Sequence, residues 1–497
     1  MSYFIGIDTS TTATKALLID EHGSMVSIGR STYGFETPRP LWSEQEPQLW
    51  WDATVEAIRE ALASSGASGS DVHGIGLTGQ MHGLVMLDEH GEVLRPSILW
   101  NDQRTQNECD KIRQLVGRDR LISITGNDAL TGFTAPKILW VANNEPDIFE
   151  RTEHILLPKD YVRYQLTGDF ATDRAGGSGT IMFDLAARDW SSEIAETLGV
   201  PLSWLPRTFE GSEATGTITT EAAALTGLSV GTPVFGGGGD QAANAVGVGA
   251  VSPGIVAMSI GTSGVVFAPT STPVVEPEGR LHAFCHSVPN TWHLMGVMLS
   301  AAGSLQWFKD HITPDKSFPE LSQMAQETPA GSDGLLFLPY LSGERTPHPD
   351  PLARGAFVGL TVRHGINHMA RSVMEGVAFG LRDIAELITS LTDLGEVRVS
   401  GGGASSQTWL QIVADVMGVP IHIVGTPDAA SHGAALLAAT GAGVFGSAAE
   451  AADAAVEVHG TIEPTSNSGL YNDAYGTYRD LYPALQPSFH RLASLDN

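Results

Sequence analysis

The sequence predicts an α/β protein of two domains, and three observations support this prediction. First, 497 residues with 42% hydrophobic side chains can fill at least two cores, because a single core stops growing at roughly 250–300 residues. Second, short apolar segments such as 75–79, 233–237 and 397–403 alternate with amphipathic stretches such as 49–63, a pattern typical of α/β folds. Third, one strand–turn–strand pattern occurs in both halves of the chain.

The repeated pattern begins near the N-terminus, where the apolar YFIGID is followed by the hydroxyl-rich TSTTATK and the apolar ALLID. The second copy reads IVAMS, then a turn from Ile260 to Gly264, then VVFAP. Each copy predicts a β-hairpin that opens one half of the chain. Between them, residues 246–254 are rich in glycine, proline and small residues, which indicates a boundary between an N-terminal domain at 1–248 and a C-terminal domain at 249–497. Two such hairpins facing each other across a central cleft resemble the actin-like ATPase architecture.

The charge balance narrows the class of partner. The chain has 28 Lys and Arg against 56 Asp and Glu, which gives a net charge of −28 at pH 7. This charge repels nucleic-acid backbones and anionic membranes, so we expect a small-molecule partner, no nucleic acid and no membrane. Two cysteines, Cys109 and Cys285, lack metal-ligand spacing and are typical of a protein of the reducing cytoplasm. The sequence also lacks the pattern of a signal peptide or a membrane span.

The two hairpin turns are candidate phosphate-binding sites. Thr, Ser and Gly at a turn offer backbone N–H groups and hydroxyls without bulk. Asp8 ends the first strand beside such a turn, where a carboxylate could hold a hydrated Mg²⁺. An Asx-turn or a helix cap is the alternative for either turn alone, but their duplication favours phosphate binding. A Walker-type site is excluded, because the one lysine followed by Ser or Thr, Lys316, is preceded by Asp315.

Two glycine-rich segments are further candidates for the functional site. The segment GGGGDQAANAVG (236–247) places Asp240 between four glycines and a helix of small residues, and we expect the glycines to let the backbone approach a ligand closely. Asp240 stands where a helix N-cap would, so nearby N–H groups should keep its carboxylate ionised and make it a weak base. The segment GGGASS (401–406) lies between a strand and a helix pattern, and it forms either a platform for a flat ligand or only a tight turn.

Two longer segments, 132–144 and 355–375, resemble the two signature segments of the FGGY carbohydrate kinases. The resemblance extends from Gly6 to beyond Gly433. Four shorter segments are similar to those of family members that act on D-xylulose: GQMHG (79–83), LWND (99–102), LPKDY (157–161) and LSGERTP (341–347). The resemblance implies the two-domain actin-like ATPase (ribonuclease H-like) fold, ATP with Mg²⁺, and D-xylulose as the sugar that is phosphorylated.

The resemblance also implies roles for single residues. Asp240 is then the catalytic base that takes the proton of the C5 hydroxyl, and Asp8 organises Mg²⁺ and the phosphates. The first phosphate turn contributes Thr11, Thr12 and Lys15, although Ser10 stands here where the family often has glycine. The second phosphate turn is Gly261, Thr262 and Ser263, while Gly402, Gly403 and Ser406, with the segment at Gly433, border the adenosine. The sugar-contacting residues are Gln80, Met81, His82, Trp100, Asn101 and Asp102, together with Asp240.

Two alternatives stay open at this point. The chain could phosphorylate another ketose or polyol, such as L-xylulose, D-ribulose, gluconate or glycerol. It could also be a non-catalytic actin-like module that binds sugar, although the presence of both Asp8 and Asp240 argues against that. A homodimer is one assembly that the sequence leaves open.

Overall fold

Two main β-sheets organise the computed structural model, which describes residues 2–425 and 428–495. The strands of the first sheet are β1 (Tyr3–Thr9), β2 (Ala13–Ile19), β3 (Met25–Thr32), β5 (Val72–Gly79), β13 (Ala214–Thr217) and β14 (Pro233–Gly239). Those of the second are β15 (Ile255–Ile260), β16 (Gly264–Thr270), β17 (His282–Cys285), β18 (Trp292–Met298), β21 (Glu396–Ser400), β22 (Ile421–Val424) and β23 (Val458–Ile462). Short pairs surround them: β4 (Glu44–Gln45) with β7 (Ser97–Ile98), β6 (Val85–Leu87) with β8 (His154–Leu156), β9 (Ala171–Asp173) with β12 (Arg207–Phe209), β10 (Phe183–Asp184) with β11 (Asp189–Trp190), and β19 (Leu336–Leu338) with β20 (Ala356–Val358).

Helices of the N-terminal half surround the first sheet. They are α1 (Pro47–Ser65), α2 (Gln106–Val116), α3 (Arg118–Thr125), α4 (Thr134–Asn144), α5 (Pro146–Arg151), α6 (Pro158–Thr167), α7 (Arg174–Ser178), α8 (Ser192–Leu198), α9 (Thr220–Thr226) and α10 (Asp240–Gly247). The C-terminal half contributes α11 (Ala302–His311), α12 (Phe318–Glu327), α13 (Ile366–Thr389), α14 (Gln407–Met417), α15 (Ala429–Gly441), α16 (Ala448–Ala455) and α17 (Ser468–Ala493). None of the helices within 2–425 and 428–495 has the length and apolar character that crossing a bilayer demands.

The two sheets share one strand order. The first runs β3-β2-β1-β5-β14 and the second β18-β16-β15-β21-β22, with β13, β17 and β23 added at the edges. In both, three antiparallel strands precede two strands that pair in parallel. This repetition confirms the predicted α/β class and the predicted hairpin at the start of each half. Lys15 lies within β2, beyond the first turn.

Helices cover both faces of the first sheet. Ile5 and Ile7 of β1 pack with α1, whereas Phe4 packs with α15 on the opposite face. The backbone of α15 comes very close to the sheet, since a Cβ on Gly6 would lie 1.8 Å from the carbonyl oxygen of Ser431. The segment around Gly433, which we expected beside adenosine, is therefore part of a helix packed against α10 and the first sheet.

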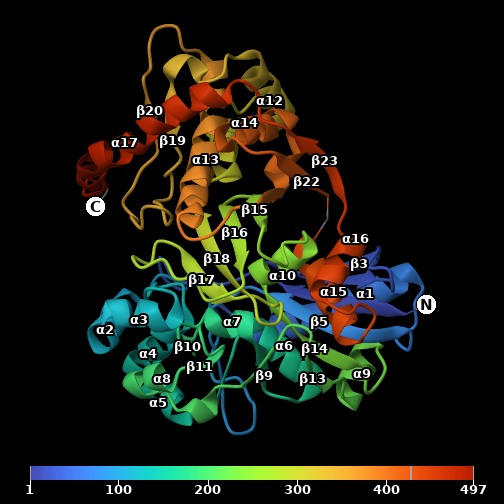
Figure 1. The fold of residues 1–497 in the computed structure, drawn as a ribbon. Helices are drawn as coiled ribbons and strands as arrows, with labels where there is room; N and C mark the ends of the chain where they lie inside the picture. Colours follow the sequence, from blue (N-terminus) through green and yellow to red (C-terminus); the bar gives the residue numbers. More distant parts are fainter. Residues whose placement is uncertain (1, 426–427, 496–497) are drawn as a thin grey trace.

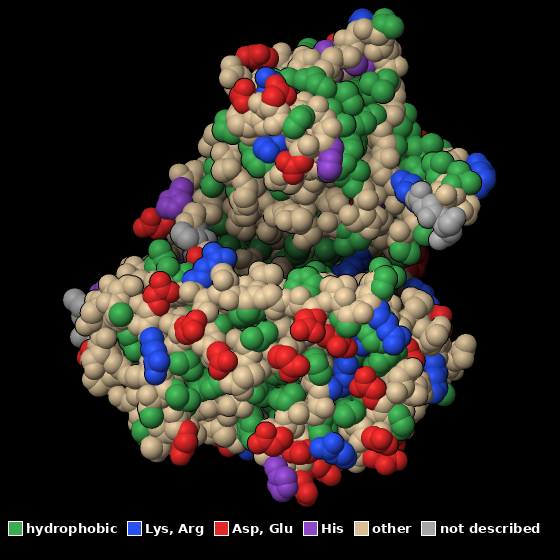
Figure 2. All heavy atoms as spheres, turned by 180° about the vertical axis from the view of Figure 1, so that it is seen from behind, with side chains coloured by type: hydrophobic (Ala, Val, Ile, Leu, Met, Phe, Trp, Pro, Cys, Tyr) green, Lys and Arg blue, Asp and Glu red, His purple; other side chains and the backbone are tan. Residues whose placement is uncertain are grey.

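The return of α15 and α16 to the first sheet affects the division into domains. In Figure 1 these two helices lie in the lower body with α1, although they come from the C-terminal half, while α12, α13, α14 and α17 form the upper body. The boundary at residue 248, just after α10, stays a prediction. On the face shown in Figure 2, a groove runs between the two bodies and acidic side chains are scattered over the lower one.

The second sheet also has two different faces. Val256, Met258 and Ile260 of β15 join the core formed with α13 and α17. The alternate residues, such as Val265 of β16, Phe284 of β17 and Met295 of β18, pack instead with the N-terminal half. Val265, Phe284 and Met295 of this second face line part of the site described below.

Candidate active site

The glycines before Asp240 allow other parts of the protein to pack closely against β14. Gly237 has a φ of 66°, which favours glycine. A Cβ added to Gly237 would lie 1.7 Å from the carbonyl oxygen of Leu77. A Cβ on Gly238 would lie 2.5 Å from Ser287 Oγ, and one on Gly239 would lie 2.7 Å from Met81 Sδ. The expectation that this run admits a ligand is therefore wrong for these three positions. They let β14 pack tightly against β5 and bring Met81 beside Asp240.

Asp240 is the first residue of α10, and Gly239 is the N-cap. Its Oδ1 accepts a hydrogen bond of 2.8 Å from the N–H of Gln241. Burial raises the pKa of Asp240 to about 6 and outweighs the lowering by this N–H. Both the expected N-cap position and the expected low pKa are thus wrong, because the enclosed site disfavours the charge more than one amide stabilises it. The carboxylate is a stronger base than a free aspartate and is still mostly ionised at pH 7.

A cavity of about 290 Å³ lies in front of Asp240, and both halves of the chain line it. The structure brings most of the expected sugar-contacting residues to this cavity: Gln80, Met81, His82, Trp100 and Asp240, with Thr11 and Ser263 from the two hairpin turns. Residues that the sequence did not single out complete the wall: Leu130, Gly132, Phe133 and Gln241 from the N-terminal half, and Val265, His282, Phe284, Met295, Val297 and Arg345 from the C-terminal half.

His82 is held in an uncommon backbone conformation, with a φ of 71°. Its Nδ1 lies 2.6 Å from the carbonyl oxygen of Gly179, so Nδ1 must carry the proton and donate. Burial lowers the pKa of His82 well below its usual value, with a further contribution from Lys137. The ring is therefore neutral, and its Nε2 is left as a hydrogen-bond acceptor for a hydroxyl group.

Lys137, from the first resembling segment, holds the loop that carries His82. Its buried ammonium donates to the backbone carbonyls of His82 (3.0 Å) and Gly132. Burial lowers the pKa of Lys137 to about 7. Two loops that line the cavity are thus joined through one side chain.

Asn101 and Asp102 lie outside the lining of the cavity. Asp102 is completely buried, accepts a hydrogen bond of 2.7 Å from the N–H of Ser43 and forms an ion pair of 2.7 Å with Arg104. Trp100, beside them, is 41% exposed and donates from Nε1 to Thr11 Oγ1 at 3.0 Å. The carboxylate of Asp102 therefore orders the loop that presents Trp100.

Asp8 is the second-last residue of β1 and is 8% exposed. Burial raises its pKa to about 7; repulsion from Asp240 adds to the rise, and Lys15 opposes it. Its Oδ1 has no hydrogen-bond partner among the described residues. An unpaired buried carboxylate oxygen beside a second carboxylate fits a hydrated Mg²⁺, which takes one or two carboxylates and completes its shell with water and phosphate. Within the described part of the chain, no group of three acidic, His or Cys residues could hold a metal alone.

Two other residues predicted for the first phosphate turn, Thr12 and Lys15, lie outside the lining of the cavity. Lys15 projects from β2 into an ion pair with Asp428, just before α15. Thr12 is exposed at the tip of the turn. Neither residue lines the cavity in front of Asp240, in contrast to Thr11.

A larger pocket of about 1130 Å³ lies in the C-terminal half. Five of the residues expected at the nucleotide line it: Gly261, Thr262, Gly402, Gly403 and Ser406. Helices α11 and α12 form the opposite wall through residues such as Gln306 and Phe318. The turn 261–263 thus borders both spaces, because Ser263 lines the smaller cavity while Gly261 and Thr262 line the larger pocket.

The three consecutive glycines at this pocket differ in surroundings. Gly401 has a φ of 92°, and a Cβ on Gly403 would lie 2.5 Å from a side-chain carbon of Ile260. A Cβ on Gly402, in contrast, would meet nothing within 4 Å. Ser406 accepts a hydrogen bond of 3.2 Å from the N–H of Trp409 and so caps α14. The segment combines a tight turn with one open glycine that faces the pocket.

Family models match this arrangement over both halves. The N-terminal domain of the FGGY family of carbohydrate kinases matches residues 3–247, and the C-terminal domain of the same family matches residues 256–442. The chain belongs to the FGGY family of carbohydrate kinases. Its α/β structure with two repeated sheets is the actin-like ATPase fold of these kinases.

Individual FGGY kinases resemble the chain over almost their whole length. Xylulose kinase of Escherichia coli is 41% identical over 97% of this chain and 99% of its own. The crystal structure of xylulose kinase from Rhodospirillum rubrum is 31% identical, with a TM-score of 0.92 over 98% of this chain and 100% of that one. A gluconate kinase from Lactobacillus acidophilus is 27% identical, with a TM-score of 0.94 over 99% of both chains.

The lining residues that we did not predict differ in whether the sequence carried a signal for them. Gln241 directly follows Asp240, Phe133 lies in the first resembling segment, and Arg345 lies in LSGERTP. These three could have been found from the resembling segments. His282 and Met295, in contrast, stand in ordinary apolar strands, and nothing in the sequence pattern separates them from core residues.

Proposed function

We propose that this FGGY kinase transfers the γ-phosphoryl group of ATP to the C5 hydroxyl of D-xylulose, giving D-xylulose 5-phosphate and ADP. The observation that carries the proposal is the carboxylate of Asp240, which faces a sugar-sized cavity at its junction with the two hairpin turns. The choice of D-xylulose rests on the E. coli xylulose kinase, which is similar over nearly the entire chain.

In the proposed reaction, the C5 hydroxyl donates a hydrogen bond to Asp240. As the bond between O5 and the γ-phosphorus forms, the bond from that phosphorus to the ADP oxygen breaks, and the proton passes to the Asp240 carboxylate. Because the transition state of phosphoryl transfer is loose, the hydroxyl needs to lose its proton only late. A base with a pKa of about 6 is ionised at neutral pH and takes up that proton more readily than an ordinary aspartate.

The two hairpin turns and Asp8 hold the phosphates in this proposal. Thr11, Thr262 and Ser263 present small side chains and backbone N–H groups, which suit phosphate oxygens. Asp8 would hold Mg²⁺, which when bound neutralises charge on the phosphates. The purine then lies over Gly402 and beside Ser406 in the larger pocket.

The sugar is recognised by polar groups on several sides of the smaller cavity. Nε2 of His82 accepts from a hydroxyl, and Oε1 of Gln80, which has no partner among the described residues, is a second acceptor. Phe133 and Val265 supply apolar wall against the carbon chain. Gluconate is a second candidate, because Arg345 places a cation in the cavity and the similar gluconate kinase has the same fold.

The cellular setting is also a proposal. Cys109 and Cys285 are both buried and unpaired, which is consistent with a reducing cytoplasm. A homodimer stays a prediction that light scattering coupled to gel filtration would test.

A substrate panel tests the proposed function. ADP release is measured with D-xylulose, L-xylulose, D-ribulose, gluconate and glycerol, with Asp240→Asn as the inactive control. We expect the highest kcat/KM for D-xylulose. A higher value for any other acceptor would replace D-xylulose and leave the kinase activity standing. ADP release that no acceptor increases would refute the kinase proposal itself.

A further inference from the structure

Arg345 places a cation in the sugar cavity, where the neighbouring Glu344 is an opposite charge that acts on it. Its side chain lines the cavity and is only partly exposed. Among the described residues, no hydrogen bond or ion pair reaches its guanidinium; the contact it makes is through its backbone N–H, which donates to Glu344 at 2.7 Å. Enclosed arginines elsewhere are paired, as Arg104 is with Asp102 and Arg188 is with Glu210. Enclosing an unpaired charge is unfavourable, so the guanidinium is available for a ligand.

The loop that carries Arg345 is fixed to the sheet behind it. Glu344 accepts a second backbone hydrogen bond, of 3.0 Å, from Leu299. Thr346 and Val297 exchange two hydrogen bonds, of 3.1 and 3.3 Å. Both neighbours of Arg345 are thereby tied to the end of β18, so the guanidinium is presented from a rigid support.

Two neutral histidines lie on the same side of the cavity as Arg345. His282 Nδ1 is 2.8 Å from Asn127 Oδ1, and the amide group of Asn127 donates to Ala283 O at 2.9 Å, so Oδ1 accepts and Nδ1 of His282 donates. Nε2 of His282, like that of His82, is therefore an acceptor. The charge of Arg345 lowers the pKa of both histidines, after the larger effect of burial, so the guanidinium lies near them.

We propose that Arg345 is a sugar-recognition residue, whose guanidinium donates hydrogen bonds to oxygens of the acceptor at the end remote from the hydroxyl that is phosphorylated. Each hydroxyl at that end can accept from Arg345 and donate to Nε2 of His82 or His282, which matches the mixed donor and acceptor character of a sugar. The proposal rests on the proposed sugar-kinase function, and it holds for any acceptor of the substrate panel that is longer than glycerol.

The test compares Arg345→Met with Arg345→Lys, using the best acceptor on the panel and the truncated acceptor dihydroxyacetone. Losing hydrogen bonds from a charged donor should lower kcat/KM for the full-length sugar by about 10- to 100-fold, chiefly through KM. The KM for ATP should stay within about twofold, as should kcat/KM for dihydroxyacetone, which is too short to reach the far end. Arg345→Lys should recover part of the loss, because it keeps the charge but not the forked geometry.

Controls separate recognition from structural roles. Arg363→Met removes an exposed arginine that lines neither space and should change nothing. Sugar binding without nucleotide, measured by calorimetry, should weaken in Arg345→Met alone, while its Tm without ligand stays at or above that of the parent. A loss in kcat of equal size for both acceptors would place Arg345 at the transferred phosphoryl group and overturn the proposal. A lower Tm with an unchanged KM for sugar would overturn it as well. A different best acceptor of more than three carbons would change only the sugar used in this test, whereas glycerol as the best acceptor would overturn the proposal, because it has no remote end.

Discussion

The sugar cavity and the nucleotide pocket are built in different ways. The cavity, of about 290 Å³, is enclosed by side chains from both halves of the chain. The pocket, of about 1130 Å³, is lined by the C-terminal half and includes several glycines and serines. We infer that the enzyme discriminates between sugars through side chains that are already in place, whereas the nucleotide is held largely by backbone and by shape.

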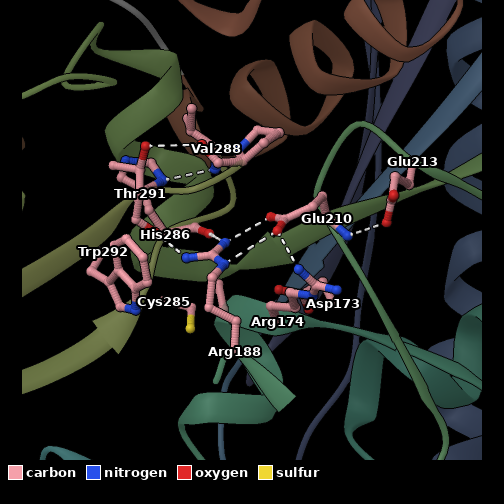
Figure 3. A network of polar contacts seen from close by, with 12 residues as sticks. Asp173, Arg174, Arg188, Glu210, Glu213, Cys285, His286, Val288, Thr291 and Trp292 are labelled. Carbon is pink, nitrogen blue, oxygen red and sulfur yellow. Dashed lines mark hydrogen bonds and ion pairs between the residues drawn. The ribbon is translucent and has the colours of Figure 1, made fainter. Parts of the chain in front are cut away.

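A buried polar network keeps the two halves together beside the sugar cavity (Figure 3). Arg188 binds Glu210 with two hydrogen bonds, of 2.7 and 3.2 Å, and donates to the carbonyl oxygen of Thr291 at 2.5 Å. Arg174 pairs with the same Glu210 at 2.6 Å, and the Arg188 guanidinium lies 4.8 Å from the centre of the Trp292 ring. This network fastens the hairpin β17–β18, whose other residues form the sugar-cavity wall, to the N-terminal half.

The largest effect should come from Asp240, the proposed base, which lines the sugar cavity. Asp240→Asn keeps the shape of the side chain but removes the proton acceptor, so kcat should fall by about 10²-fold or more. Binding of sugar and of ATP, measured by calorimetry, should stay close to that of the parent. A variant that turns over at near the parental rate would show that another group accepts the proton.

The pH dependence of kcat in the parent enzyme also tests the assignment of Asp240 as the base. Burial raises the pKa of Asp240 to about 6, and the base is active only when it is deprotonated. At saturating Mg²⁺, which favours the ionised form of Asp8, the kcat should therefore rise with pH up to about 6 and level off above it, with a slope near tenfold per pH unit on the acid side. The residual activity of Asp240→Asn should lack this limb. A parental profile that is flat from pH 5 to 7 would contradict the assignment.

Loosening the buried network should affect the sugar cavity and leave the nucleotide pocket alone. Arg188→Lys keeps the charge facing Glu210 but loses the forked contact to Glu210, the hydrogen bond to Thr291 and the stacking on Trp292. We expect the KM for sugar to rise by about tenfold, of the order of one or two lost hydrogen bonds, with the KM for ATP unchanged. Arg120→Lys, in the exposed ion pair with Glu193, is the matched control. Equal rises in both KM values would mean that the two spaces are not independent.

The sequence predicted most of the N-terminal side of the site, because those residues lie in short segments with recognisable patterns. Asp8, Met81, His82 and Asp240 all stand at strand ends beside glycine or hydroxyl residues. Asn101 and Asp102 are exceptions, because neither lines the cavity and the carboxylate of Asp102 pairs with Arg104. Whether an aspartate turns toward a ligand or a neighbouring arginine depends on side-chain packing that the segment LWND does not encode.

The C-terminal wall of the sugar cavity could not be predicted, for a different physical reason. His282 faces the cavity because Asn127, 155 positions earlier, binds its ring. Arg188 holds the same hairpin from more than 100 positions away, at Thr291. The packing of α15 on the first sheet likewise joins residues far apart in the sequence. It is possible because Gly6 has no Cβ that would clash with the carbonyl oxygen of Ser431. Local patterns predict strands and turns, but they do not predict which distant strand closes a cavity.

The smallest effect should arise at the open glycine of the nucleotide pocket. A methyl group on Gly402 would contact no protein atom within 4 Å, and its φ is not in the left-handed region, so Gly402→Ala should fold with an unchanged Tm. The methyl group would stand where we place the purine, and the KM for ATP should rise by about fivefold, as for a modest loss of packing of about 1 kcal/mol. The KM for sugar should not change. Gly469→Ala, at an equally open glycine in α17, should alter neither KM value. Gly401→Ala should instead lower the Tm, because Gly401 has a φ of 92° and its Cβ would lie 2.9 Å from the backbone of Ile260. If Gly402→Ala leaves the KM for ATP as it was while Gly401→Ala destabilises the protein, the three glycines form only a tight turn, and the purine must bind elsewhere in the pocket.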